Sequence, residues 1–155
     1  MSNIKNENFK PIAQNKKARH EYSVLETYEA GIVLYGSEVK SLREGRVSLN
    51  ESYAAEREGD LYLLNTNISE YPGANRFNHE PRRSRKLLLH RREIAKIASR
   101  IKQDGMTLIP LSMYFNHKGM VKVQLGLCKG KQKADKRAAE KEKEWRKDRK
   151  QLVDN

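Results

Sequence analysis

Alternating apolar and polar residues predict β-strands through the middle of the chain. The clearest case is residues 120–128, where valine and leucine at every second position alternate with Lys122, Gln124 and Gly126. With residues 107–115 and the turn at 116–119, this segment predicts a hairpin that has one buried and one solvated face.

Two further strand regions precede it. Residues 53–57 and 61–68 flank Glu58-Gly59-Asp60 and predict another hairpin. The apolar, β-branched stretch from residue 22 to residue 34 is interrupted by Gly31, which fits two short strands or one bent strand, and Gly36 marks a turn.

Helical spacing is found in two places. In residues 91–104, Ile94, Ile97 and Ile101 form one narrow apolar stripe, and Gly105 supplies the stop. A shorter helix is predicted from a Ser37 cap to Gly45. Residues 71–81, with two prolines and a glycine, predict a loop. Short antiparallel strands with two helices indicate a mainly β fold, either a small barrel or a sandwich.

The two ends of the chain differ from this core, which we place at residues 20–128. Residues 1–19 are rich in Asn and Lys and have no apolar period, so they predict a flexible basic arm. Residues 129–155 are almost entirely charged, with Ala138, Trp145 and Leu152 as their only apolar thread. Such a tail is at best a weak helix when free, and it serves either to dock on an anionic surface or merely to keep the protein soluble.

Charge is concentrated at those ends. The chain of 155 residues has 32 Lys and Arg against 20 Asp and Glu, a net charge of +12. Residues 1–19 carry +4, residues 20–128 carry +3 and residues 129–155 carry +5. This distribution indicates a polyanionic partner whose phosphate backbone is followed by the arms.

Two sets of side chains inside the core could contact nucleic acid. The basic run from Pro81 to Lys86 could bind phosphate through its arginines, or it could be a solvated charge run. Five tyrosines in strand-like regions could stack on bases, although most fit core or half-buried strand positions better: Tyr22, Tyr28, Tyr35, Tyr53 and Tyr62.

Catalytic and metal-binding patterns are missing from the sequence. The four histidines are scattered, without the spacing of a metal site, and we predict neither a catalytic residue nor a cofactor. Cys128 is the single cysteine and fits an ordinary, partly buried position. No apolar run is long enough to span a bilayer and no signal peptide is visible, so we expect a cytoplasmic protein.

Four ordered blocks resemble the SsrA-binding protein (small protein B) family of bacterial trans-translation. The resemblance covers the chain from about Asn15 to its end. The blocks are NKKARHEY at 15–22, EAGIVLYGSEVKSLREG at 29–45, RSRKLLLHRREI at 83–94, and GKQKADKR at 130–137 with Glu144-Trp145 after it.

The resemblance implies a six-stranded antiparallel barrel of the oligonucleotide-binding (OB) type, with flanking helices and a C-terminal tail that is disordered when free. It implies a monomeric adaptor, not an enzyme, that binds the tRNA-like domain of transfer-messenger RNA. The adaptor delivers this RNA to stalled 70S ribosomes for rescue and for tagging of incomplete proteins. Its tail would enter the vacant mRNA channel beyond the decoding centre and become helical there.

Residue roles follow from the same resemblance. RNA contacts would involve His20, Tyr22, Glu29, Arg83, Arg85, Lys86, Leu88 and His90. The ribosome-binding tail would use Gly130, Lys131, Lys133, Asp135, Lys136, Arg137, Trp145, Leu152 and Val153. Some relatives have Asn in place of His90 and other residues in place of Gln132 and Ala134, so stacking of His90 on a base is not implied.

Two other functions are compatible with a basic tail on a small core. A ribosomal or assembly protein would remain on ribosomes that carry intact messages. An RNA nuclease or modification enzyme would change RNA as a pure protein. Neither accounts for the four ordered blocks.

Overall fold

The computed structural model describes residues 10–73 and 78–129, and these form nine strands and three helices. The helices are α2 (Lys16–Glu21), α3 (Gly36–Arg43) and α4 (Arg91–Asp104). The strands are β1 (Lys10–Gln14), β2 (Ser23–Ile32), β3 (Val47–Ser48), β4 (Tyr53–Arg57), β5 (Asp60–Leu64), β6 (Asn67–Ile68), β7 (Arg85–Leu88), β8 (Thr107–Phe115) and β9 (Val121–Lys129).

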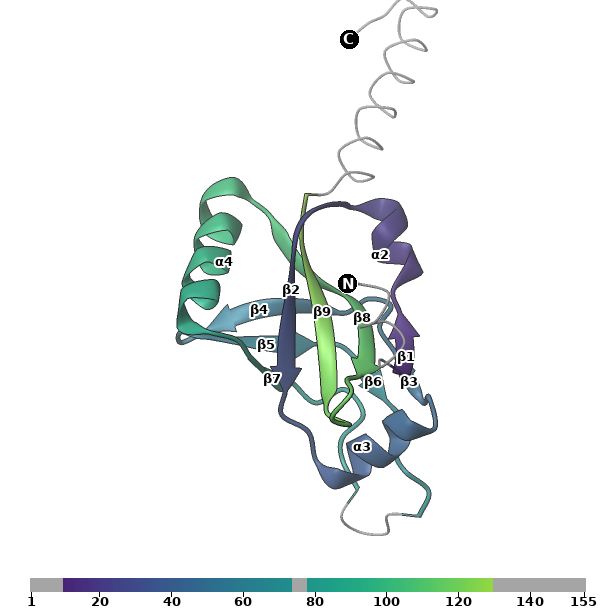
Figure 1. The fold of residues 1–155 in the computed structure, drawn as a ribbon. Helices are drawn as coiled ribbons and strands as arrows, with labels where there is room; N and C mark the ends of the chain where they lie inside the picture. The colour runs from purple at the N-terminus through teal and green to yellow at the C-terminus, as the bar shows by residue number, and fades with distance from the viewer. Residues whose placement is uncertain (1–9, 74–77, 130–155) are drawn as a thin grey trace, which may run out of the picture.

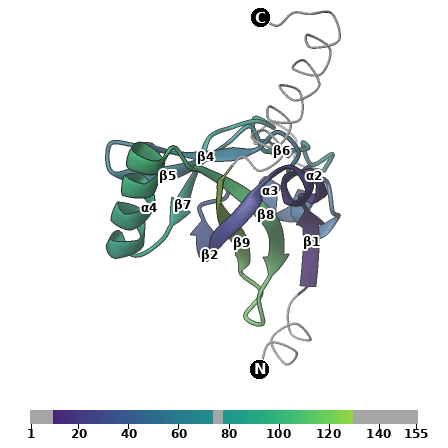
Figure 2. The same ribbon diagram turned by 90° about the horizontal axis from the view of Figure 1, so that it is seen from above.

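Six strands close into an antiparallel barrel. The sheet order is β1-β8-β4-β5-β7-β2-β9, and β9 also pairs with β8, which joins the two ends of the ring. β1 lies outside this ring on the edge of β8, as Figure 1 and, seen from above, Figure 2 show. The prediction of a mainly β fold with a six-stranded antiparallel barrel is confirmed, and the choice left open between barrel and sandwich is settled.

Irregular pairing bends the longest strands around the barrel. The β2–β9 register shifts between Val24 and Glu26, and the β8–β9 register shifts between Pro110 and Ser112. A bulge bends a strand and increases its twist, and it also tolerates the missing N–H of a proline. The stretch before Gly36 is therefore one bent strand.

The barrel interior is filled by alternate residues of each strand. Leu61, Leu63 and Leu125 are fully buried, and α4 adds Ile94 and Ile97 to the same core. Burying one such side chain contributes about 1.5–3 kcal/mol. Ion pairs of Lys96 and Arg100 with Glu26 of β2, each at 3.5 Å, connect α4 to the barrel wall.

The prediction of a flexible arm over residues 1–19 is wrong for residues 10–19. Lys10–Gln14 pair with β8, from Lys10 opposite Phe115 to Gln14 opposite Ser112, and α2 follows at once. Main-chain hydrogen bonds to a distant strand hold this segment, so its sequence needs no apolar period.

A second, smaller core lies between α2 and the barrel wall. It contains Ala18, Ile109, Leu111 and Cys128, all buried. The predicted solvated face of the 107–128 hairpin is therefore covered near this end, and Cys128 is fully instead of partly buried. Burial raises the pKa of the Cys128 thiol to about 11.

The other predicted elements need small changes. α4 has the predicted bounds and ends at Gly105, whose φ of 65° is left-handed. α3 begins at Gly36 with Tyr35 as its cap, so the predicted Ser37 cap is wrong. The Tyr35 N–H donates to Glu38 Oε1 at 2.7 Å, which stabilises the first turn in place of a serine hydroxyl.

Candidate nucleic-acid interface

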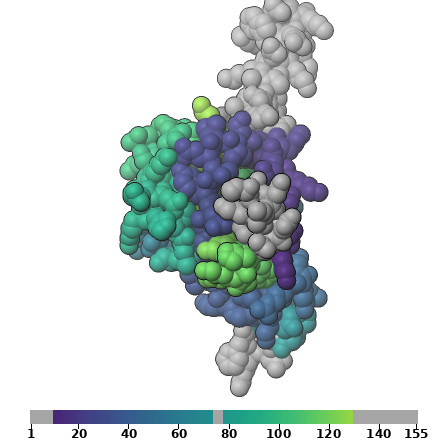
Figure 3. Space-filling model, viewed as in Figure 1, coloured from purple at the N-terminus to yellow at the C-terminus, as the bar shows by residue number. Residues whose placement is uncertain are grey.

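The outer face of β2, with its neighbours β7, β9 and β8, forms the candidate interface. In Figure 3, β2 forms the surface between α4 and α2. Leu25 and Leu88 are large apolar residues that remain 48% and 50% exposed. Leu88 of β7 lies opposite Gly31 of β2, and Glu29 is the next residue of β2 on the same face. Apolar surface on Leu88 is therefore open to a partner beside the polar Glu29.

Glu29 is held in place from the neighbouring strands. Its backbone lies opposite Gln124 of β9, and the Tyr114 hydroxyl of β8 donates a hydrogen bond to Glu29 Oε2. Burial and this hydrogen bond raise the pKa of the Tyr114 hydroxyl, so the tyrosine stays protonated as a donor at neutral pH. The carboxylate therefore has a fixed position on an exposed strand.

A polar chain extends this face toward α2. Arg19 Nη2 donates to Gln124 Oε1 at 3.2 Å, and the Ser112 hydroxyl donates to the same oxygen at 3.3 Å. His20, the next residue of α2, is exposed, whereas Tyr22 is half-buried and packs against the smaller core. His20 is thus available for contact and Tyr22 is mainly a packing residue.

Arg85 was predicted to contact RNA, and its position contradicts this prediction. Its side chain is 0% exposed, and Nε donates to Glu38 Oε2 at 2.7 Å. The remaining guanidinium nitrogens donate to main-chain carbonyls of Thr66, Pro81, Arg83 and Glu80 at 2.9–3.4 Å. Every donor is satisfied inside the protein, so Arg85 organises the loop around it instead of binding phosphate.

Arg83 is largely committed to the same cluster. Its Nη2 lies 2.6 Å from Glu38 Oε1, and its guanidinium carbon lies 4.0 Å from the centre of the Tyr35 ring. Burial raises the pKa of the Glu38 carboxyl, but hydrogen bonds from Arg83 and the Tyr35 N–H, with the charge of Arg85, outweigh burial and leave that pKa below its usual value. The predicted phosphate-binding run is thus partly a structural ion cluster.

Lys86 and His90 face outward, as a contact role requires. Lys86 is half-exposed and lies 3.7 Å from Asp60. His90 is exposed at the N-cap of α4, and its N–H donates to Glu93 Oε1 at 3.1 Å. His90 follows Leu88 by two residues, just beyond the end of β7, whereas Leu88 itself is on the side of the barrel that carries Glu29.

Comparison with known proteins identifies the family. The model of the SmpB protein family matches residues 12–155. The chain belongs to the SmpB family.

Its relatives match nearly end to end. The SsrA-binding protein of Rhizobium johnstonii is 54% identical over 93% of this chain and 95% of the relative. That of Agrobacterium fabrum is 53% identical over 93% and 90%. A chain in a solved structure described as "tmRNA-SmpB: a journey to the center of the bacterial ribosome" is 50% identical, with a TM-score of 0.65, over 76% of this chain and 82% of that one.

The roles predicted for the tail residues rest on the sequence alone. All nine predicted tail residues, from Gly130 to Val153, lie outside the described residues. Within the described ranges, no group of three or more His, Cys, Asp or Glu could hold a metal ion. None of the helices described in those ranges is long and apolar enough to cross a membrane.

The interface also contains three residues of this chain that the sequence analysis did not select. Tyr114, Gln124 and Arg19 meet there only because β8, β9 and α2 are brought together by the fold. The alternation of residues 120–128 already placed Gln124 on an outward face. No local signal paired Tyr114 with Glu29, which is 85 residues away.

Proposed function

We propose that this member of the SmpB family binds the tRNA-like domain of transfer-messenger RNA and delivers it to stalled ribosomes. The relatives that match nearly the whole chain are named SsrA-binding proteins, and the similar solved structure is described as tmRNA-SmpB in the ribosome. The observation that carries the proposal is the outer face shared by Glu29 of β2 and Leu88 of β7, with the exposed His90 two residues beyond Leu88.

The chemistry of this face suits a folded RNA. Leu88 offers an apolar contact for an unstacked base or a sugar, and the fixed Glu29 carboxylate can accept from a 2′-hydroxyl or an amino group. Hydrogen-bond donors around it, the exposed His20 on α2 and the half-exposed Lys86 on β7, lie where phosphates of the same RNA would pass. Such contacts recognise the shape of the folded RNA more than its base sequence.

We further propose that the protein is a monomeric adaptor of the bacterial cytoplasm without catalytic activity of its own. Its tail, residues 130–155, would enter the vacant mRNA channel of the 70S ribosome and become helical there. The excess of positive charge in this segment and the spacing of its Glu and Lys residues support this role.

Replacing Leu88 with Ala tests the proposed face. We expect the affinity for the isolated tRNA-like domain to fall about tenfold, because an exposed apolar anchor at the centre of an interface is lost. Fluorescence anisotropy with labelled RNA measures this change. Tyr53→Ala is the matched control, because Tyr53 of β4 is 45% exposed and lies outside this face.

Unchanged affinity in Leu88→Ala, or an equal loss in both variants, would contradict the proposal. Thermal unfolding of both proteins shows whether a loss comes from the fold. Leu88 points outward, so we expect its truncation to leave the unfolding temperature almost unchanged.

A further inference from the structure

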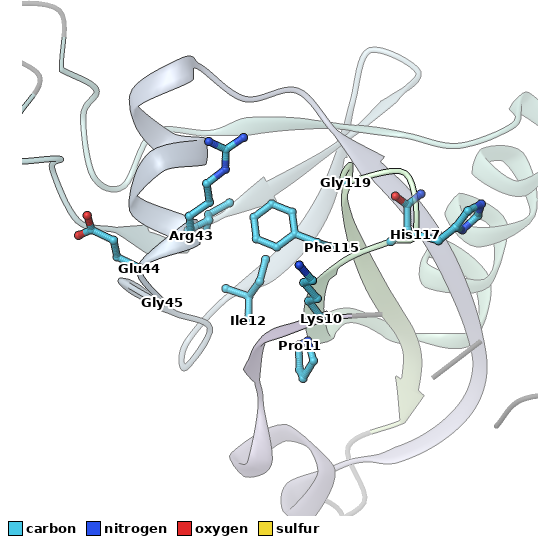
Figure 4. A pocket seen from close by; sticks show the side chains of 11 residues that line it. Lys10, Pro11, Ile12, Arg43, Glu44, Gly45, Phe115, His117 and Gly119 are labelled. Atoms are coloured by element: carbon cyan, nitrogen blue, oxygen red, sulfur yellow. The ribbon is translucent and has the colours of Figure 1, made fainter. Parts of the chain in front are cut away.

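A pocket of about 560 Å³ lies where β1, the end of α3 and the β8–β9 turn meet. Figure 4 shows its side chains, and none of the residues predicted to contact transfer-messenger RNA is among them. The side chains that give the pocket its chemical character are Lys10, Ile12, Arg43, Glu44, Phe115 and His117.

The floor of the pocket is apolar and contains one aromatic ring. Ile12 and Phe115 are partly buried and pack against the main core. In Figure 4 the Phe115 ring lies in the middle of the pocket, between Ile12, Arg43 and Lys10. Phe115 thus packs against the core and also lines the cavity, where a base could contact its ring.

The rim carries two positively charged side chains that have no partner among residues 10–73 and 78–129. The Lys10 and Arg43 side chains are both exposed, and neither donates a hydrogen bond to, or forms an ion pair with, another residue in the described part of the chain. The acidic residue at the same rim, Glu44, is already paired, since its Oε1 lies 3.0 Å from Arg46 Nε. The exposed His117 imidazole lies at the opposite side of the opening.

We propose that this pocket binds one nucleotide of a single-stranded RNA segment, with the base against Phe115 and the phosphate between Lys10 and Arg43. A fixed ring beside mobile cations is the usual arrangement for sequence-tolerant binding of single strands. The site is additional to the face of Glu29 and Leu88, so it does not depend on the function proposed above.

An RNA strand fits this pocket better than a free nucleotide. The pocket borders the C-terminal end of α3, where helix carbonyls carry partial negative charge. No helix N-terminus in the described part of the chain contributes to the lining, so main-chain N–H groups do not form a phosphate cradle. Side-chain cations alone bind a phosphate weakly. Weak binding is sufficient for one nucleotide of an RNA strand, because other nucleotides of the strand contact the protein elsewhere.

The test uses the isotopically labelled full chain and hexauridylate as the probe. We expect the amide signals of Gly45 and Gly119, which line the pocket, to shift and saturate, while that of Gly31 beside Leu88 does not. Arg43→Gln should weaken this binding about fivefold or more, and Phe115→Leu should weaken it while keeping the core contact. Lys118→Gln, a loss of the same charge from an exposed turn residue outside the lining, should change it less than about twofold.

Three results would overturn the proposal. The first is a set of shifts that never saturates or that avoids Gly45 and Gly119. The second is an equal effect of Arg43→Gln and Lys118→Gln. The third is binding of uridine 5′-monophosphate as tight as that of hexauridylate, which would make the ligand a free nucleotide. Binding of the tRNA-like domain by Arg43→Gln, measured in parallel, should stay within about twofold of the original, and an equal loss there would deny a separate site.

Discussion

Glu38 is the single acidic residue at the centre of the arginine cluster. It is 0% exposed, and its two oxygens lie 2.6 Å from Arg83 and 2.7 Å from Arg85. Arg85 in turn joins the loop before β7 to the rest of the barrel through four main-chain carbonyls. A buried cation without its counter-ion is very unfavourable, so the position of this loop depends on Glu38.

Glu38→Gln should therefore destabilise the fold by about 3 kcal/mol, since Arg85 would remain buried and charged. Urea unfolding followed by circular dichroism measures the loss. Glu51→Gln is the control, because the Lys17–Glu51 pair at 2.8 Å is largely exposed and contributes little. Equal stability of the two variants would show that the cluster has no such role.

The same carboxyl predicts a pH dependence. The pKa of Glu38 in the folded protein lies below its ordinary value of 4.5, despite burial, because of Arg83, the Tyr35 N–H and Arg85. A lowered folded pKa contributes stability above pH 4.5, and this contribution is lost as the pH falls from there through the folded pKa. The difference in unfolding free energy between the original protein and Glu38→Gln should shrink from about pH 6 to about pH 3. A difference that stays constant would contradict this assignment.

Among the elements, the short helix α2 is attached to the barrel by its buried cap, Asn15, in addition to the packing of Ala18. Asn15 Oδ1 accepts from the Ala18 N–H at 3.0 Å, and Asn15 Nδ2 donates to the carbonyls of Leu49 and Pro110 at 3.2 and 3.0 Å. One amide thus caps the helix and fixes it to two parts of the barrel. α2 carries Arg19 and His20, so Asn15 positions one border of the proposed RNA face.

Asn15→Ala should lower the unfolding free energy by about 2 kcal/mol, because a helix cap is lost and the carbonyls of Leu49 and Pro110 each lose one of their hydrogen-bond donors. Hydrogen exchange should become faster in Asn15→Ala than in the original protein, and this increase should be larger for the amides of α2 than for those of β5 or β9. Asn50→Ala, which changes an exposed asparagine, serves as the reference. Unchanged exchange in α2 would mean that the small core alone holds this helix.

The elements also show what the sequence can reveal. α4 and the β8–β9 hairpin have strong local periods, and their bounds were predicted to within a residue. β1 and α2 were missed because distant pairing and Asn15 hold them. The prediction for Arg85 was wrong, although the alternation of side chains along β7 could have corrected it. Arg85 and Leu87 face the interior, whereas Leu88 faces outward. Its partner Glu38 lies 47 residues away, beyond any local pattern.

In the whole molecule, we propose that the barrel binds RNA and that residues 130–155 sense the ribosome. Removal of these residues should leave affinity for the tRNA-like domain within about twofold, because the outer face is intact, and should abolish tagging on stalled ribosomes. A reconstituted translation system with a message that lacks a stop codon measures tagging. A matched variant with Asp135, Lys136 and Arg137 changed to Ala should show part of the same defect.

Affinities for two RNAs at about 0.15 M salt show whether the barrel recognises its partner. We expect residues 1–129 to bind the tRNA-like domain of transfer-messenger RNA at least about tenfold more tightly than a generic duplex of equal length. The affinity for both should fall with added salt, since phosphate contacts release counterions. Equal affinity for the two RNAs would contradict recognition by the barrel face and leave only nonspecific attraction to a basic protein.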